Sequence, residues 1–255
     1  FFFKQKTAYE IPKRDWSSDV CSSDLVFAIL LLSYRHFAKS TTQAEKIYFY
    51  LGLISIVLVV NSAVGVFATT FFWCHMVQHM ILMMVTGPLI VMGTVNHWRF
   101  EGKIWNFITN SWLIWFLYAG LMIGVHFTEL HKILMMNSLV HDFVEVPLYI
   151  VVSYLFYYHI LETKNINRKI SPGLAVLLLF FMMVPETLTG FFIYAAPNSL
   201  YEGMYTLNDQ RLGGALMWSG SMIIDAVWLS FAVREWLRSE ANLAQQLDEE
   251  IANEK

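Results

Sequence analysis

Long apolar stretches, separated by short polar segments, dominate the hydrophobic pattern of this chain. A helix needs about 20 apolar residues to cross a bilayer. Six stretches reach roughly that length with no more than one acidic residue each: Ile47–Phe67, Phe71–Val95, Ile104–Val125, Phe143–Leu161, Leu174–Ala196 and Leu212–Val233. The pattern therefore predicts an all-α, polytopic membrane helix bundle with six full transmembrane helices.

Residues 1–25 do not share this pattern. They are polar, lack periodicity and stop abruptly at the apolar run Leu25–Tyr34. We interpret them as a non-native segment, because they look like a translated sequencing adapter. Leu25–Tyr34 has ten residues, too few to cross a bilayer, and we interpret it as a truncated first span. We expect the natural protein to have seven spans, a helical membrane domain over 26–237 and an acidic cytoplasmic tail over 238–255.

Composition supports lipid as the solvent for most of the chain. Hydrophobic residues make up 56% of the sequence and charged residues 15%, against about 25% charged in soluble domains. The net charge is −3 and the sequence contains no Lys/Arg run, which argues against nucleic-acid binding. Two cysteines do not form a disulfide framework.

Basic residues in the short loops predict the direction of the spans. Alternate loops hold ten Lys/Arg, and the loops between them hold only Lys132 and Arg211. Since basic loops stay in the cytoplasm, we expect a bacterial cytoplasmic-membrane protein with its C-terminus inside. His36, His97 and His159 then fall on the inner side, where we interpret His97 and His159 as interfacial anchors. The other five histidines fall near the outer face: His75, His79, His126, His131 and His141.

The outer histidines have the spacing of a metal site. His75, His79 and Met83 share one helical face, and Met76, Met80 and Met84 form the adjoining stripe. Imidazole and thioether ligands suit copper, above all Cu(I). His126 ends the next span and His141 opens the following one, so both are expected to reach the site.

Other polar residues near this level are assigned smaller roles. Glu145 follows His141 by one turn and is expected to orient an imidazole. His131 is expected to lie in a loop outside the site, and the role of Cys74, as ligand or small apolar filler, is left open. Asp209 is expected to cap its own helix or to line the mouth of the site.

Two acidic residues lie deep in predicted spans. Glu186 follows Pro185 about 15 Å below the outer end of its helix, a depth at which a carboxyl group is functional by default. Asp225 is deeper still, where an interhelical polar contact is as good an interpretation as a function.

No enzymatic signature accompanies the histidines. The zincin spacing His-x-x-x-His is present, but Met76 and Gln78 occupy positions where that chemistry needs a glutamate base. Haem ligation by His79 with His126 or His141 stays open.

The segment HMVQHMILMMVTGPLIVMG resembles the hallmark of the CtaG family of bacterial cytochrome c oxidase assembly proteins. Gly124-Val125-His126, the His141-led segment, the Met-Met-Val-Pro stretch and the Asp209-Gln210 motif before the last span follow in the family's order. The resemblance covers roughly residues 45–237. It implies a seven-span, non-catalytic assembly factor for haem-copper oxidase that acts in copper supply.

The resemblance also implies the partners: cytochrome c oxidase subunits, a copper donor and the lipid bilayer. Two further hypotheses remain. The first is a copper transporter, with Met122, Met182, Met183 and Met222 along a pore. The second is a membrane haem protein.

Overall fold

The computed structural model describes residues 28, 30–36, 41–95, 102–135, 140–161 and 170–253. Within these residues every regular element is a helix, which confirms the predicted all-α fold. The predicted non-native segment 1–25 and His97 lie outside the described residues.

The elements follow one another with short connections. They are α2 (Gln43–Val60), α3 (Ala63–Ala68), α4 (Phe72–Ile81), η2 (Leu82–Thr86), α5 (Gly87–Thr94), α6 (Lys103–Ile108), α7 (Ser111–Phe127), α8 (Leu130–Met135), η3 (His141–Glu145), α10 (Val146–Ile160), α11 (Pro172–Ala195) and α12 (Leu207–Asn253). Elements η2 and η3 are single π-helical turns that continue directly into α5 and α10.

Five helical stretches of the described chain are long and apolar enough to cross a membrane: Gln43–Val60, Phe72–Thr94, His141–Ile160, Pro172–Ala195 and Leu207–Asn253. They correspond to five of the six expected spans. The remaining one, Ile104–Val125, is not a single helix. It is divided into α6 and the 17-residue α7, because the Asn110 side chain accepts hydrogen bonds from the backbone N–H groups of Trp112 and Leu113 and begins a new helix there.

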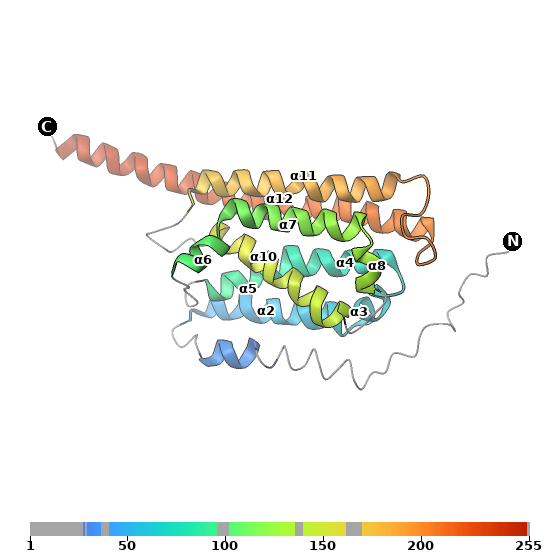
Figure 1. Cartoon of the computed structure of the whole chain (residues 1–255). Helices are drawn as coiled ribbons and strands as arrows, with labels where there is room; N and C mark the ends of the chain where they lie inside the picture. Colours follow the sequence, from blue (N-terminus) through green and yellow to red (C-terminus); the bar gives the residue numbers. More distant parts are fainter. Residues whose placement is uncertain are drawn as a thin grey trace.

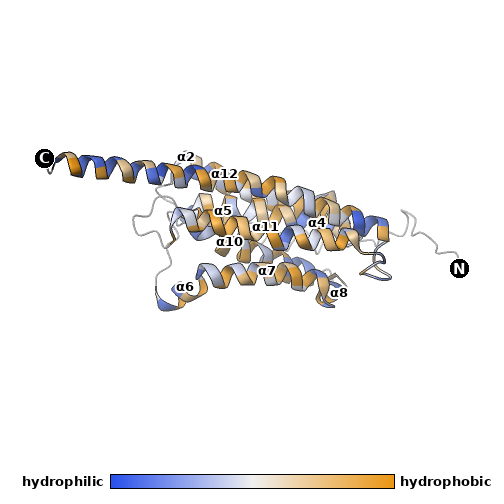
Figure 2. Cartoon of the chain, turned by 90° about the horizontal axis from the view of Figure 1, so that it is seen from above, coloured by the Kyte–Doolittle hydropathy of each residue, from blue (hydrophilic) through white to orange (hydrophobic). Residues whose placement is uncertain are grey.

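Two other expected boundaries also differ. The stretch Ile47–Phe67 is interrupted after Val60, and Ser62 caps the separate helix α3. The last helix begins at Leu207 instead of Leu212 and continues to Asn253. Figure 1 shows this helix projecting past the end of the bundle, and Figure 2 shows hydrophilic residues alternating with apolar ones along the projection.

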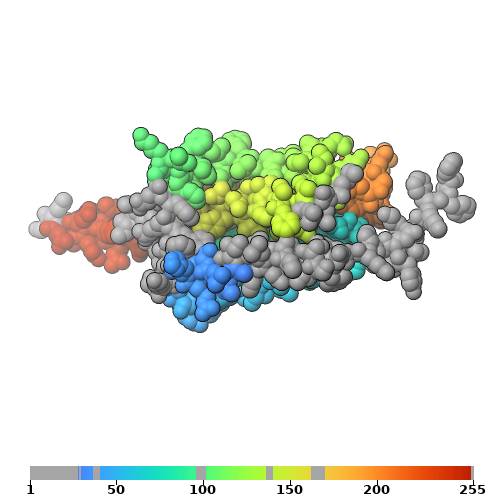
Figure 3. All heavy atoms as spheres, turned by 60° about the horizontal axis from the view of Figure 1, so that its bottom comes forward, coloured from blue at the N-terminus to red at the C-terminus, as the bar shows by residue number. Residues whose placement is uncertain are grey.

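The helices run side by side along one long axis, with α11 lying along α12 (Figure 1). Figure 3 shows the face on which α7 (green) lies next to α10 (yellow). Glycine permits the closest approach between helices. A Cβ atom on Gly190 would lie 2.6 Å from the backbone nitrogen of Trp218, and one on Gly214 would lie 2.6 Å from that of Tyr194. Small residues at such crossings let membrane helices pack backbone to backbone.

The π-helical turn η2 follows from Pro88, which has no N–H to donate. In a regular α-helix Gly87 would donate to the carbonyl of Met83 and residue 88 to that of Met84. Instead the Gly87 N–H donates to the carbonyl of Leu82. The carbonyls of Met83 and Met84 therefore lose their helical partners inside an apolar bundle.

Side chains from two other helices satisfy these carbonyls. Trp228 of α12 donates its indole N–H to the carbonyl of Met84 at 2.7 Å, and the Ser153 hydroxyl of α10 donates to that of Met83. Gly87 leaves room for the serine, since a Cβ there would overlap the Ser153 hydroxyl. The turn that interrupts the helical hydrogen bonds thus connects its own helix to α10 and α12.

Replacing Trp228 by Phe should leave the Met84 carbonyl buried without a donor. We expect a loss of about 1–3 kcal/mol in the free energy of unfolding, measured by denaturant titration in detergent micelles. Trp236→Phe is the matched control, because its indole bonds only to Glu240 on the exposed part of α12. Equal stability of the two variants would contradict the role of Trp228.

Replacing Gly214 by Ala should force α11 and α12 apart and destabilise the protein by about 1–3 kcal/mol. The comparison is Gly120→Ala in α7, where an added Cβ would meet no atom within 4 Å. That change should be neutral or stabilising, because alanine restricts the unfolded chain more than glycine does. Thermal unfolding of both variants measures the difference, and a stabilised Gly214→Ala variant would refute the close crossing.

Candidate metal centre

Five histidines lie together at one end of the bundle, and all are buried. They are His75 and His79 of α4, His126 in the last turn of α7, His131 of α8 and His141 of η3. We call these five residues the histidine cluster. The four outer histidines predicted as ligands are therefore brought to one place by three different parts of the chain.

Four of the imidazoles form a closed ring of neighbours. The ring centroids are 3.9 Å apart for His75 and His79, 5.7 Å for His79 and His126, 6.3 Å for His126 and His131, and 5.0 Å for His131 and His75. Each nitrogen lies about 2 Å from a tetrahedral ion, which separates the centroids of two ligating imidazoles by roughly 5 Å. The His75–His131 and His79–His126 separations are close to that value, whereas His75 and His79 are nearer and His126 and His131 farther apart, so the imidazoles would have to shift to share one ion.

The prediction for His131 was wrong. His131 lies in the short helix α8, which folds back after α7, and its side chain is fully buried. Its ring is 4.5 Å from that of Tyr201 and 5.8 Å from that of Phe72. Burial, followed by repulsion from His126, lowers the pKa of His131 to about 3. The imidazole is therefore neutral at pH 7 and can act as a ligand.

Most nitrogens of the cluster have no hydrogen-bond partner. Both ring nitrogens of His75 and His131, Nδ1 of His79 and Nε2 of His126 are buried without one, whereas His79 Nε2 faces the Glu145 carboxylate at 3.2 Å. His126 Nδ1 lies 2.6 Å from the carbonyl oxygen of Met122, so the ring donates from Nδ1 and directs the Nε2 lone pair into the cluster. A ligating histidine in a metal site is held in the same way.

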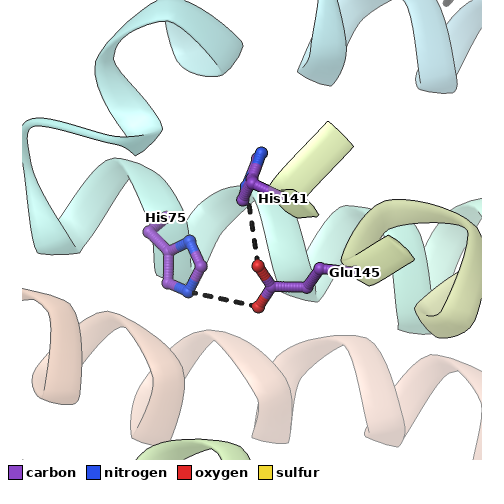
Figure 4. A group of neighbouring side chains, drawn as sticks. All are labelled: His75, His141 and Glu145. Atoms are coloured by element: carbon purple, nitrogen blue, oxygen red, sulfur yellow. Dashed lines mark ion pairs between the residues drawn. The ribbon is translucent and has the colours of Figure 1, made fainter. Parts of the chain in front are cut away.

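Glu145 contributes a carboxyl group to the cluster. One oxygen, Oε1, is 3.2 Å from His79 Nε2 and 3.8 Å from His75 Nε2, and the Tyr149 hydroxyl donates to it at 3.2 Å. The other oxygen is 3.9 Å from His141 Nε2 and has no hydrogen-bond donor. Figure 4 shows Glu145 between His75 and His141, and ligand atoms of these three residues lie within 4.8 Å of one another.

His141 differs from the other four histidines, because polar side chains engage both of its ring nitrogens. Nε2 lies 3.0 Å from the Gln78 amide oxygen, and Nδ1 lies 2.7 Å from the Asp142 carboxylate. Gln78 in turn donates to the carbonyl of Val59 in α2. His141 is thus held in the cluster by Gln78 of α4 and by its own neighbour Asp142.

The Asp209-Gln210 motif positions the site without belonging to it. Asp209 does not cap its own helix; its two carboxylate oxygens accept from the backbone N–H groups of Phe72 and Trp73 and so cap α4. Thr206 supplies the side-chain cap of α12. Because α4 begins at this point, Asp209 fixes the height at which His75 and His79 enter the bundle.

Gln210 holds the connection between α11 and α12 over the cluster. Its amide oxygen accepts from the Leu200 N–H at 2.7 Å, and its amide nitrogen donates to the Ile193 carbonyl at 3.0 Å. Tyr201, next in the connection, donates to the carbonyl of His126. The rings of Tyr201 and Tyr205 both pack on Phe72 and His131. We call these two residues the aromatic cover; burial raises the pKa of both phenols.

The predicted methionine ligands point toward a second space. Met76, Met80 and Met83 line a small cavity of about 10 Å³ that His79, His126 and Glu186 also reach. Glu186 is 1% exposed, and neither of its oxygens has a hydrogen-bond partner, although Asp225 and Tyr118 lie close to it. The depth predicted for Glu186 thus places it below the histidines, on the same cavity.

Two further sequence interpretations change. His159 is 3% exposed and packs against Tyr158, so it is a buried side chain instead of an interfacial anchor. The four methionines assigned to a transport pore do not share one cavity: Met122 lines the space just described, whereas Met222 is 42% exposed on the outside of the bundle.

Three signals were missed in the sequence: His131, the aromatic cover and Gln78. Gln78 lies three residues after His75 on the same helix, whereas His131 and the two tyrosines of the aromatic cover lie in other segments. The five-residue separation of His126 and His131 would have been informative only with the helix break at Thr128, where α7 ends.

Relatives of this chain have been found among the curated proteins. The uncharacterized protein ML1998 of Mycobacterium leprae is 22% identical over 229 residues, which are 77% of this chain and 35% of the relative. The uncharacterized proteins Mb0105 of Mycobacterium bovis and MT0111 of Mycobacterium tuberculosis are each 21% identical over 254 residues, 87% of this chain and 38% of the relatives. The chain thus spans little more than a third of the length of these relatives. No solved structure matches it.

The family resemblance carried by the paired histidines and the Asp-Gln motif is confirmed over nearly the whole membrane domain. The family model for the cytochrome c oxidase caa3 assembly factor (Caa3_CtaG) matches residues 25–239, and the chain therefore belongs to this family.

Proposed function

We propose that this protein is a membrane assembly factor for haem-copper cytochrome c oxidase and that it holds copper in the histidine cluster as cargo for the oxidase. Family membership supports the assembly role. The observation that carries the copper proposal is the set of buried imidazole nitrogens without partners in His75, His79, His126 and His131. Leaving so many polar atoms unpaired is costly in an apolar interior, and a bound ion would satisfy several at once.

Copper fits the donors better than Mg²⁺ or Ca²⁺ does. Imidazole with nearby thioether is a ligand set that favours Cu(I), whereas Mg²⁺ and Ca²⁺ require oxygen ligands. The Glu145 carboxyl group would offset the positive charge of the ion. Tyr149 and the Met122 carbonyl hold Glu145 and His126 in place from behind.

The dimensions of the site support an ion over a porphyrin. Centroids of neighbouring rings in the cluster are at most 6.3 Å apart, and the adjoining cavity measures about 10 Å³, close to the space that one water molecule needs. The aromatic cover closes the outer side and keeps water from the imidazoles. A bound haem would have to displace several of these buried residues.

In the cell we place this protein in the bacterial cytoplasmic membrane, with the histidine cluster at the outer face and the end of α12 in the cytoplasm. The basic residues of the loops support this direction. Its partners would be a copper donor and oxidase subunits, met at the outer face. The role is non-catalytic, because loading and release of copper require no bond to be broken in a substrate.

Replacing His79 or His131 by Ala should weaken Cu(I) binding about tenfold or more, because each removes one imidazole from the ring of four. Competition with a chromophoric Cu(I) chelator measures the affinity of the purified protein. His159→Ala is the matched control: it is also a buried histidine, but it lies about 20 Å along α10 from Glu145.

The same variants test the role in cells. In a strain that lacks the native gene, the His79→Ala and His131→Ala proteins should support less assembled oxidase than His159→Ala, measured as oxidase activity and copper-centre spectra. Wild-type Cu(I) affinity together with full oxidase activity in both cluster variants would overturn the proposal.

A cysteine scan in a background without Cys21 and Cys74 tests the direction of the spans. Glu129 and Ser239 are both exposed. A membrane-impermeant maleimide should label Glu129→Cys in intact cells and Ser239→Cys only after permeabilisation. The reverse pattern would place the histidine cluster on the cytoplasmic side.

A further inference from the structure

A methionine-lined cavity lies directly beneath the histidine cluster. Six methionines reach it from four elements: Met76 and Met80 of α4, Met83 and Met84 of η2, Met122 of α7 and Met217 of α12. We call the space that these six residues line the methionine cavity. The remaining lining residues are His79, His126, Glu186 and Ser221, so two histidines of the cluster form part of its wall.

Core packing alone does not account for this composition. Methionine is an ordinary gap filler in hydrophobic cores, but a filler role would not place polar atoms on the same space. Glu186 is 1% exposed, and its carboxyl group lies close to Asp225 and Tyr118 in the interior of the bundle. His126 Nε2 is unpartnered, while Nδ1 of the same ring is fixed by the Met122 carbonyl. The cavity wall therefore combines several thioethers with an unpartnered imidazole nitrogen and a buried carboxyl group.

We propose that the methionine cavity is a second Cu(I) site with thioether ligands of its own, which adjoins the histidine cluster at His79 and His126. Thioether sulfur is a soft ligand that selects Cu(I) over harder divalent ions. The volume of about 10 Å³ is suited to one ion. This inference rests on the proposed copper-handling function and adds a second, chemically different site to it.

The π-helical turn is what gathers the sulfurs. Four of the methionines come from one continuous helical stretch, in which Met80 follows Met76 by four residues and Met83 and Met84 follow Met80 by three and four, so that all lie on one side. The last two belong to η2. Trp228 and Ser153 hold the backbone of this turn by their bonds to the carbonyls of Met84 and Met83. The sulfurs of the cavity are therefore presented by a backbone fixed from two sides, with Met122 and Met217 facing them from other helices.

His79 and His126 give the two sites a physical connection. His79 has its ring 3.9 Å from that of His75 in the upper cluster, and it also lines the methionine cavity. His126 likewise contacts His131 above and the cavity below. An ion that moves between the sites exchanges imidazole for thioether ligands without leaving the protein interior.

The test compares two double variants of the full chain in a background in which Cys21 and Cys74 are alanine. Met122→Leu with Met217→Leu changes the cavity; Met92→Leu with Met182→Leu changes two methionines that do not line it. Both exchanges nearly conserve volume. Silver(I), a redox-inert probe for Cu(I), is titrated while the methyl groups of ¹³C-labelled methionine are observed by NMR.

We expect two Ag(I) ions per wild-type chain and per control chain, and one per chain for the cavity variant. In the wild type the methyl signals of Met122 and Met217 should shift on Ag(I) addition. Unshifted signals, or two ions bound by the cavity variant, would overturn the second site.

Two further measurements separate this inference from the proposed function. His75→Ala with His131→Ala should abolish binding in the histidine cluster and leave the Ag(I)-induced shifts of the methionine methyl signals intact. Failure of the histidine-cluster site would thus be distinguished from failure of the methionine cavity. X-ray absorption of the Cu(I)-loaded wild-type chain needs no variant of the cavity. It should contain a sulfur shell around copper, and a spectrum with nitrogen and oxygen scatterers only would refute the proposal.

Discussion

Within a bilayer, a main-chain carbonyl that loses its helical donor must find another inside the protein, because lipid offers none. The turn η2 faces this constraint twice, at Met83 and Met84, because Pro88 cannot donate. Ser153 and Trp228 supply the missing donors from α10 and α12. These two bonds connect the helix that carries His75 and His79 to the helices on both sides, so the position of these two histidines depends on them.

The hydrogen bonds at η2 stabilise the fold, whereas the histidine cluster opposes it. Five imidazoles and a carboxyl group are buried together, and most of their polar atoms are left unpaired. Such an arrangement opposes folding by desolvation, and the surrounding aromatic and helical contacts must outweigh that cost. In the copper-handling role that we propose, the unpaired nitrogens are the atoms that a bound ion would satisfy.

The Asp209-Gln210 motif shows how residues outside a site can define it. Asp209 fixes the start of α4, and Gln210 fixes the connection that carries the aromatic cover. One motif at the start of α12 thus sets both the depth of the paired histidines and the closure above them. In this chain the two side chains act by positioning other segments of the bundle.

The sequence by itself determined the helical class, five of the spans and the gathering of His75, His79, His126 and His141, because apolar length and helical spacing are local properties. It also indicated Glu145 and the methionine stripe through one-turn intervals. The break at Asn110 is also local, since that side chain caps the residues that directly follow it, but it was not predicted. The sequence did not determine the burial of His131, and it assigned the Asp209 cap to the wrong helix. Those features depend on contacts between segments up to 137 residues apart. Only the tertiary structure decided them, because a side chain's hydrogen-bond partner across helices is set by how the helices pack and not by its neighbours in the chain.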